Sequence, residues 1–161
     1  MTNNDDEFDT FFRKHLVSVV QHLVRLGFTR ECAEEATEST MVTLYERWDK
    51  IDKPLPWVRC TAGWRAFDAR QELRNGPVEL TEEMGLKLHH HDSDPIERQE
   101  SAARVQRLLG RLPERQRQVI SWWLDGFSDQ EIAEALGISE ATVRSNRRHG
   151  LRKLQGVGDD D

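Results

Sequence analysis

The chain has 161 residues, of which 37% are hydrophobic and 32% charged, and its formal net charge is −6 at pH 7. This composition is typical of a helix-rich protein with one or two small domains and modest cores. Because no apolar run approaches the ~20 residues that a membrane-spanning helix needs and the N-terminus has no secretion signal, we expect a cytoplasmic protein without membrane insertion.

The charge is unevenly distributed along the chain. Residues 1–100 carry 13 Lys+Arg and 20 Asp+Glu, whereas residues 101–155 carry 10 and 6. A basic segment in an acidic chain is the electrostatic candidate for contact with nucleic acid. The two cysteines, Cys32 and Cys60, lack the number and spacing of a disulfide framework or a metal motif. We expect them to be buried thiols.

Helical periodicity dominates the first half of the chain. Apolar residues recur at helical spacing from Phe8 to Leu26, before a natural stop at Gly27. Thr29 is expected to cap a second helix, whose inner stripe is Ala33, Ala36, Thr40, Met41, Leu44, Tyr45 and Trp48. Pro54 and Pro56 are expected to break the chain near Lys53. A third helix then follows, with Val58, Ala62, Ala66 and Leu73 on one side and Trp57, Thr61, Trp64 and Asp68 on another.

The composition of the middle of the chain predicts a linker. Residues 76–94 contain Gly, Pro and acidic residues without a sustained period, and a loop of this length is unusual inside one compact domain. No segment alternates between apolar and polar residues for long enough to predict a β-strand. We therefore predict an all-α protein of two small helical domains joined by a flexible linker: a first domain of residues 1–76, a linker of 77–100, a second domain of 101–156, and an acidic tail of 157–161.

The second half of the chain contains the signals of a helix-turn-helix. Pro113 is expected at the first position of a helix whose inner face is Val119, Ile120, Trp123 and Leu124. Ser128 and Glu131 have the spacing of a reciprocal capping box, Gly137 provides a turn, and Ser139 can cap the last helix. Two capped helices joined by a short turn are typical of DNA-binding helix-turn-helix modules.

A helical wheel of the last helix separates an apolar side from a basic one. Val143, Gly150, Leu151 and Leu154 cluster on one side, while Ala141, Ser145, Arg148, His149 and Arg152 lie roughly opposite, with Arg144 at the flank. We expect Ser145 and Arg148 to reach base edges, and Arg152 and Lys153 to meet phosphates. Arg147 falls on the apolar side. Either its stem extends past the edge of the core, or the helix is rotated from this phase.

Two segments carry a family resemblance. LPERQRQVISWWLDGFSDQEIAEALGISEATVRSNRRHGLRKL resembles region four of bacterial sigma factors, and also the DNA-binding module of LuxR-type regulators. In the first half, CAEEATESTMVTLYERWDKI followed by PLPWVRCTAGWRAFDAR resembles region two of the extracytoplasmic-function (ECF) sigma factors. The chain as a whole therefore resembles an ECF sigma factor of the sigma-70 family. It departs from the family at Arg147, where an apolar residue is usual, and in the weakly basic run ARQELR.

The resemblance implies a promoter-specificity subunit whose partners are the core RNA polymerase, promoter DNA and an anti-sigma factor. Polymerase binding is assigned to Glu34, Glu35, Glu38 and Thr40. Contacts with the minus-ten element are assigned to Trp57, Arg59, Trp64, Arg65 and Arg70. Contacts with the minus-thirty-five element are assigned to Thr142, Arg144, Ser145, Arg148, His149, Arg152 and Lys153.

Several alternatives stay open at this point. The chain could instead be a stand-alone helix-turn-helix regulator, or a sigma-like adaptor that does not initiate transcription. Trp64 could stack on an unpaired base or pack between helices. The cluster His89–His91 could be a solvated part of the linker or a regulatory metal site. Because we find no nucleophile motif and no phosphate-binding glycine loop, we expect neither an enzyme nor a cofactor.

Overall fold

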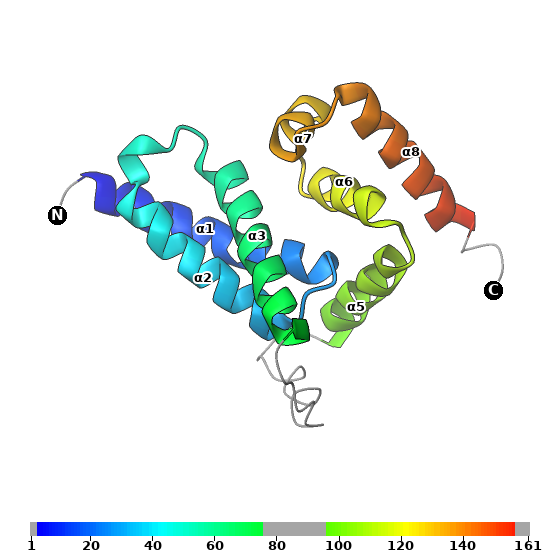
Figure 1. Ribbon diagram of the computed structural model, residues 1–161, viewed down its shortest axis with the longest axis horizontal. Coiled ribbons are helices and arrows are strands. Elements are labelled where there is room, and N and C mark those ends of the chain that lie inside the picture. The colour runs from blue at the N-terminus through cyan, green and yellow to red at the C-terminus, as the bar shows by residue number, and fades with distance from the viewer. Residues whose placement is uncertain (1–2, 76–95, 157–161) are drawn as a thin grey trace. The chain divides into compact units, whose positions relative to one another are not determined.

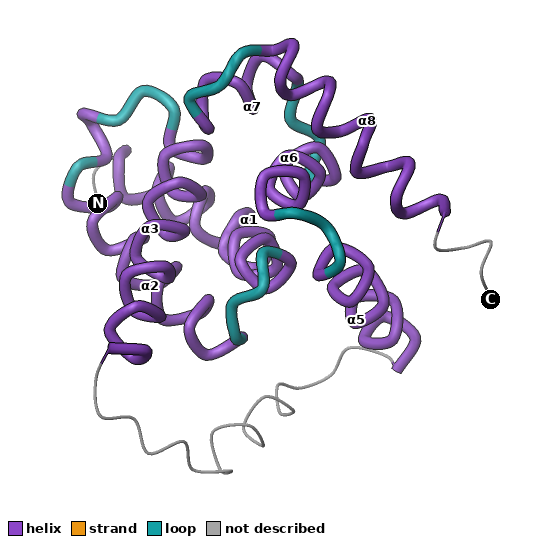
Figure 2. Tube along the Cα trace, turned by 45° about the vertical axis from the view of Figure 1, so that its right-hand side comes forward, coloured by secondary structure: helices purple, strands orange, loops and turns teal. Residues whose placement is uncertain are grey.

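The computed structural model describes residues 3–75 and 96–156, and within these ranges every regular element is a helix (Figures 1 and 2). The predicted all-α fold is confirmed. The chain divides into two compact units, one built from α1 to α3 and one from α5 to α8. None of the helices in the described ranges is long and apolar enough to cross a membrane.

The first unit consists of α1 (Asn3–Arg25), α2 (Arg30–Glu46), a short 3-10 turn η1 (Trp48–Lys50) and α3 (Pro54–Asn75). Thr29 caps α2 as predicted, since its hydroxyl oxygen accepts from the amide of Cys32 at 3.1 Å. Helices α2 and α3 pack closely, and small side chains allow this approach. The fully buried apolar residues of the unit are Val19, Leu23, Ala33, Leu44, Val58, Ala62 and Ala66.

The start of α3 differs from the sequence prediction. The chain breaks at residues 51–53, but Pro54 and Pro56 both lie in the first turn of α3. Proline is tolerated there because the first amides of a helix have no acceptor within it. Leu73, which we expected on the inner face, is 52% exposed near the end of α3. The helix therefore extends past the core that its first four turns cover.

An aromatic cluster joins the start of α1 to the end of α2 and to η1. The Trp48 ring lies 5.6 Å from the ring of Phe8 and 5.4 Å from that of Phe11, centroid to centroid, both in edge contact. Tyr45, expected inside, is 50% exposed at the rim of this cluster. Its hydroxyl donates to Asp5 at 2.8 Å, and this bond to a carboxylate raises the pKa of Tyr45.

The second unit consists of α5 (Ile96–Gly110), α6 (Glu114–Leu124), α7 (Asp129–Leu136) and α8 (Glu140–Gly156). Helix α5 begins before residue 101, where we placed the start of the second domain. Arg117 fastens the end of α5 to α6, because its guanidinium donates to the carbonyls of Leu109 and Leu112 at 3.0 Å each. The core between α5, α6 and α8 consists of Leu109, Leu112 and Ile120, with Leu151 and Leu154 packed against it.

The inner face of α6 is shifted from the predicted one. Val119 and Ile120 are buried as expected, but Trp123 is 39% exposed and Leu124 is 47% exposed. Trp122 is buried in their place, with its ring 4.8 Å from that of Phe127. The chain folds back after α6, and the amide of Phe127 donates to the carbonyl of Trp122. Pro113 is the N-cap of α6 rather than its first helical residue.

Helices α6 and α8 approach each other at a glycine, which leads to a prediction for stability. A Cβ atom at Gly150 would lie 2.3 Å from Cδ1 of Ile120, a core side chain that is 1% exposed. Overpacking of a core costs about 1–3 kcal/mol, which exceeds the ~1 kcal/mol that alanine gains over glycine in a helix. We therefore expect Gly150→Ala to lower the free energy of unfolding in urea.

The matched control for this prediction is Gly110→Ala in α5. No atom lies within 4 Å of a Cβ atom built at Gly110, so this variant should be as stable as the wild type or slightly more stable. An equal gain for Gly150→Ala and Gly110→Ala would contradict the close approach of α8 to Ile120.

Candidate nucleic-acid interface

The helix-turn-helix is built by α7, a short turn and α8. The Ser128 hydroxyl accepts from the amide of Glu131 at 3.2 Å, and the Glu131 carboxylate accepts from the amide of Ser128 at 3.1 Å, so the predicted capping box is present. Gly137 ends α7 at φ +68°, a left-handed conformation that favours glycine. Ser139 then caps α8 by accepting from the amide of Thr142 at 3.1 Å.

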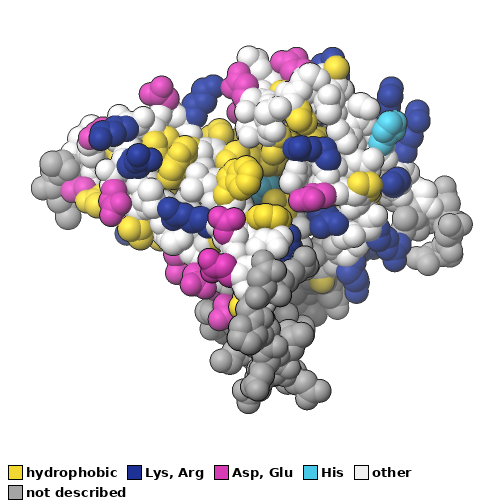
Figure 3. Space-filling view, viewed as in Figure 1, with side chains coloured by type: hydrophobic (Ala, Val, Ile, Leu, Met, Phe, Trp, Pro, Cys, Tyr) yellow, Lys and Arg dark blue, Asp and Glu magenta, His cyan; other side chains and the backbone are white. Residues whose placement is uncertain are grey.

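The two sides of α8 separate as the helical wheel predicts. Val143 and Gly150 are buried, and Leu151 and Leu154 pack against the core of the second unit. Basic side chains gather along the opposite side, over the outer surface of α8 (Figure 3). The exposed residues on this surface are Thr142, Arg144, Arg148, His149, Arg152 and Lys153, and Ser145 is half-buried beside them.

Local bonds organise the first turns of this basic surface. The Thr142 hydroxyl lies 2.8 Å from that of Ser139, and Asn146 donates to the Thr142 carbonyl at 2.9 Å. Arg144 lies 3.8 Å from the carboxylate of Glu140, with both side chains more than half exposed. A solvent-exposed pair of this kind contributes little to stability. The Arg144 guanidinium can therefore exchange this partner for a phosphate or a base.

Arg147 does not belong to the exposed basic surface. It forms an ion pair with Asp129, the first residue of α7, and the two side chains are 24% and 26% exposed. Of the two readings left open by the sequence, the extended stem is the correct one. The helix is not rotated, since Val143 and Gly150 keep their buried positions on either side of Arg147.

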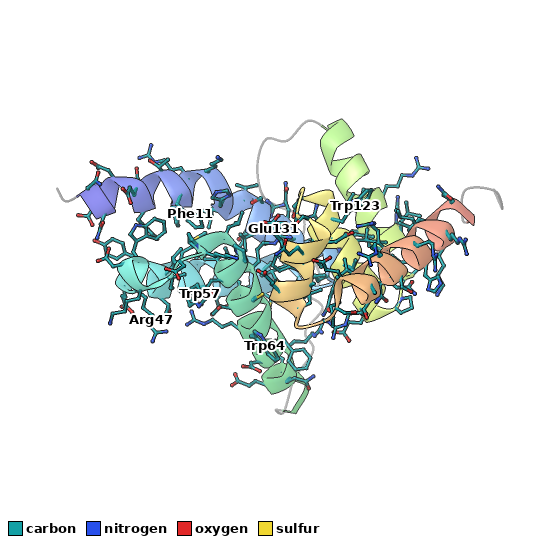
Figure 4. The ribbon with its side chains drawn as sticks, turned by 90° about the horizontal axis from the view of Figure 1, so that it is seen from above. Phe11, Arg47, Trp57, Trp64, Trp123 and Glu131 are labelled. Carbon is teal, nitrogen blue, oxygen red and sulfur yellow. The ribbon has the colours of Figure 1, made fainter. Side chains whose placement is uncertain are left out.

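Two tryptophans lie on α3, two helical turns apart (Figure 4). Trp57 is half-buried, whereas Trp64 is 70% exposed. The packing alternative for Trp64 is therefore wrong, and its indole ring is open to solvent. An exposed aromatic face is the group that stacks on an unpaired base.

The arginines assigned to the minus-ten element occupy different environments. Arg65 bridges α3 to α2, donating to Thr43 Oγ1 at 2.9 Å and to Ser39 Oγ at 3.3 Å. The guanidinium carbon of Arg70 lies 4.4 Å from the centre of the Phe28 ring, a cation–π distance. Both residues are half-buried.

Arg59 corrects the assignment of minus-ten residues. It is 2% exposed and its guanidinium donates to Nδ1 of His22 in α1 at 2.8 Å. Because a guanidinium has no acceptor, the His22 ring must be neutral and protonated on Nε2. A cation enclosed in this way is not available to a DNA strand. The spacing of Arg59 from Ala62 and Ala66 on one helical face was the signal that could have identified it.

Thr40 corrects the assignment of polymerase-facing residues on α2. It is fully buried and its hydroxyl donates to the carbonyl of Ala36 at 2.7 Å. Its place in the inner stripe of the second helix already indicated this. Glu35 and Glu38 are exposed, and Glu34 pairs with Arg30 at 3.1 Å. The surface of α2 is therefore acidic, without a threonine at its centre.

The two cysteines are thiols that are half-buried, not fully buried as we expected. Burial raises the pKa of both Cys32 and Cys60, and the Cys32 sulfur donates to the carbonyl of Ala66 at 3.7 Å. Among the described residues, no group of three or more His, Cys, Asp or Glu side chains could hold a metal ion. The cluster His89–His91 lies outside the described residues.

The raised thiol pKa values predict slow alkylation. A thiol reacts as the thiolate, so a raised pKa reduces its reactive fraction at neutral pH and moves the rise in rate to higher pH. We expect iodoacetamide to modify Cys32 and Cys60 of the folded chain more slowly than a cysteine in a short peptide, as measured by mass spectrometry across a pH series. Equal rates for the peptide and the folded chain at neutral pH would contradict the raised pKa of the two half-buried thiols.

The comparisons with known proteins agree with this architecture. Residues 102–154 match the family model described as sigma-70, region 4. Over 154 residues the chain is 27% identical to the ECF RNA polymerase sigma factor RpoE of Cereibacter sphaeroides, covering 92% of this chain and 84% of the relative. It is 25% identical to the RNA polymerase sigma factor CarQ of Myxococcus xanthus, covering 93% of this chain and 88% of the relative.

Two solved structures share the fold. CnrH, solved in complex with the cytosolic domain of CnrY, has a TM-score of 0.69 and 22% identity, covering 99% of this chain and 92% of CnrH. The sigma factor RpoE of Bartonella quintana, solved with the anti-sigma factor NepR, has a TM-score of 0.69 and 16% identity, covering 96% of this chain and 98% of that one. The sequence matches extend through both helical units: the chain is similar over most of its length to two RNA polymerase sigma factors, one of them of the extracytoplasmic-function group, and its residues 102–154 match region 4 of the sigma-70 family.

Proposed function

We propose that this chain is a promoter-specificity subunit of bacterial RNA polymerase, acting in the cytoplasm. The first unit binds the core enzyme and the minus-ten element, and the second unit binds the minus-thirty-five element. The observation that carries the proposal is the basic surface of α8, presented by a helix-turn-helix whose two helices are both capped at their N-termini. A helix of this kind places its side chains in the major groove of DNA.

The division of charge supports a subunit that a larger enzyme delivers to DNA. A protein that binds DNA alone must neutralise phosphates with its own cations, yet this chain has a net charge of −6. The exposed Glu35 and Glu38 of α2 suit a basic partner surface. An acidic first unit also weakens binding of the free chain to arbitrary DNA. Recognition at both promoter elements then depends on the core enzyme.

An anti-sigma factor is the second partner that we propose. The solved neighbours include CnrH with the cytosolic domain of CnrY, and RpoE with the anti-sigma factor NepR. Exposed apolar side chains on all three helices of the first unit offer contacts for such a partner: Val17 on α1, Val42 on α2, and Trp64, Phe67 and Leu73 on α3. A protein bound to this unit would keep the chain from the polymerase.

Run-off transcription tests the proposed function. The full chain is added to core RNA polymerase of Cereibacter sphaeroides, with a library of bacterial genomic fragments as templates, and the transcript starts are sequenced. We expect initiation at a shared pair of sequence elements, which core enzyme alone does not support. If no transcript exceeds that of the core enzyme while the free chain binds duplex DNA tightly, the chain is a stand-alone regulator or a sigma-like adaptor.

The exposed indole of Trp64 predicts a role in promoter opening. Stacking of an aromatic ring on an unpaired base contributes about 1–3 kcal/mol. Trp64→Ala should therefore make promoter opening less favourable by that free energy and reduce the fraction of promoter that is open. Permanganate reactivity of unpaired thymines measures this fraction. Trp64→Phe keeps a stacking ring and should retain most of the opening. Normal opening by Trp64→Ala would contradict the stacking contact.

A further inference from the structure

The ion pair between Arg147 and Asp129 joins the two helices of the helix-turn-helix. Arg147 lies in the second turn of α8, on the side that faces the unit, and Asp129 is the first residue of α7. Both side chains are about three-quarters buried, in contrast to Arg144 and Glu140 on the outer surface. A pair shielded from water in this way is screened less by salt than a surface pair.

The partner that Arg147 meets is held in place independently. Asp129 follows Ser128, whose hydroxyl and amide are both bonded to Glu131 in the capping box, so the first turn of α7 is fixed at two points. The connection from α7 to α8 passes through Gly137, which has no side chain of its own to restrict the turn. An ion pair across this turn therefore restrains the angle between the two helices.

We propose that Arg147 is a positioning residue: through Asp129 it orients α8, and with it the basic surface that reads DNA, without touching DNA itself. The inference rests on the proposed function, since it assumes that this surface binds DNA. It divides the arginines of α8 into two classes. Arg144, Arg148 and Arg152 face outward and can meet the duplex, whereas Arg147 is already paired inside the unit.

Salt dependence distinguishes a positioning arginine from a phosphate contact. Each phosphate contact contributes about 0.9 to the slope of log affinity against log salt concentration. The probe is a mixed-sequence duplex, bound to the full chain over a salt series starting at low ionic strength. If Arg147 orients α8, Arg147→Ala leaves the salt dependence of binding unchanged. The matched control, Arg152→Ala, should reduce the magnitude of the slope by about one.

Asp129→Ala provides the opposite test, because it releases Arg147 from its partner. A positioning role predicts that this variant does not raise the affinity for the mixed-sequence duplex. It also predicts that Asp129→Ala and Arg147→Ala both lose selectivity for the promoter found in run-off transcription. We expect the ratio of promoter affinity to mixed-sequence affinity, measured with holoenzyme, to fall about tenfold in either variant, within the range of a lost base contact. The exchanged pair Asp129→Arg with Arg147→Asp should restore the ratio.

The outcomes separate the inference from the proposed function. If Arg147→Ala lowers the salt slope by about one, or if Asp129→Ala strengthens duplex binding, Arg147 is a phosphate contact and the inference is overturned. If the exchanged pair folds by circular dichroism but does not restore selectivity, the inference is likewise overturned. If the wild-type chain binds no duplex, alone or with core enzyme, the proposed function fails, and with it the premise of this test.

Discussion

Arg59→Ala is expected to destabilise the first unit by about 3–5 kcal/mol, the range for truncating a large side chain in a core. Arg59 is 2% exposed, so its removal leaves a cavity between α1 and α3. It also removes the donor to Nδ1 of His22, which is 1% exposed. Unfolding in urea, combined with hydrogen exchange of the amides in α1 to α3, measures the loss in this unit separately from the second.

Arg59→Met separates packing from hydrogen bonding. Methionine fills much of the same volume without a charge, so this variant should lose mainly the bond to His22, about 1–2 kcal/mol. The control is Arg13→Ala in α1, where the side chain is 79% exposed, and its effect should stay within about 0.5 kcal/mol. If Arg59→Ala lowered the free energy of unfolding as little as Arg13→Ala, Arg59 would have to lie at the surface, where it could contact DNA.

Arg148→Ala is expected to weaken binding to the minus-thirty-five element by about 1–3 kcal/mol, the value of one bidentate contact with a base. Arg148 lies on the outer surface of α8, opposite the buried Val143 and Gly150. Because a base contact specifies sequence, the loss should concentrate at one base pair of the element. Holoenzyme binding to a set of single-substitution promoters measures this pattern.

Arg152→Ala is the matched comparison on the same helix. One turn further along α8, this exposed arginine is expected to meet a phosphate, so its removal should weaken binding to all promoters alike and lower the salt slope by about one. If Arg148→Ala also weakened all promoters alike, Arg148 would be a phosphate contact, and base recognition would have to be assigned to another part of the outer surface of α8.

The parts of the fold that follow from local rules could be predicted from the sequence. Capping depends on a few neighbouring residues, and the caps at Thr29, Ser128 and Ser139 formed as expected. The sequence also predicted which side of α8 is buried, because its small and apolar residues and its arginines fall on opposite sides of the helical wheel. The sequence further indicated an all-helical chain, since no segment alternates in the manner of a strand.

The parts that depend on tertiary contacts could not be predicted in the same way. The buried face of α6 shifted to Trp122 because Phe127 folds back onto it after the turn. Arg59 was assigned to DNA through the family resemblance. Its spacing from Ala62 and Ala66 indicates the buried face of α3, but its partner His22 lies on another helix and could not be identified from that spacing. Arg147 was ambiguous for a related reason: its partner Asp129 lies on a different helix, so a single-helix wheel cannot include it.

The separation of the two sides of α8 has a consequence for how this protein evolves. The positions that point to solvent carry almost none of the packing, since Val143, Gly150, Leu151 and Leu154 hold the helix in place. Substitutions at 144, 148 and 152 can therefore accumulate without loss of folding. A duplicated copy of the gene can acquire a new target sequence by such drift while the scaffold beneath stays intact.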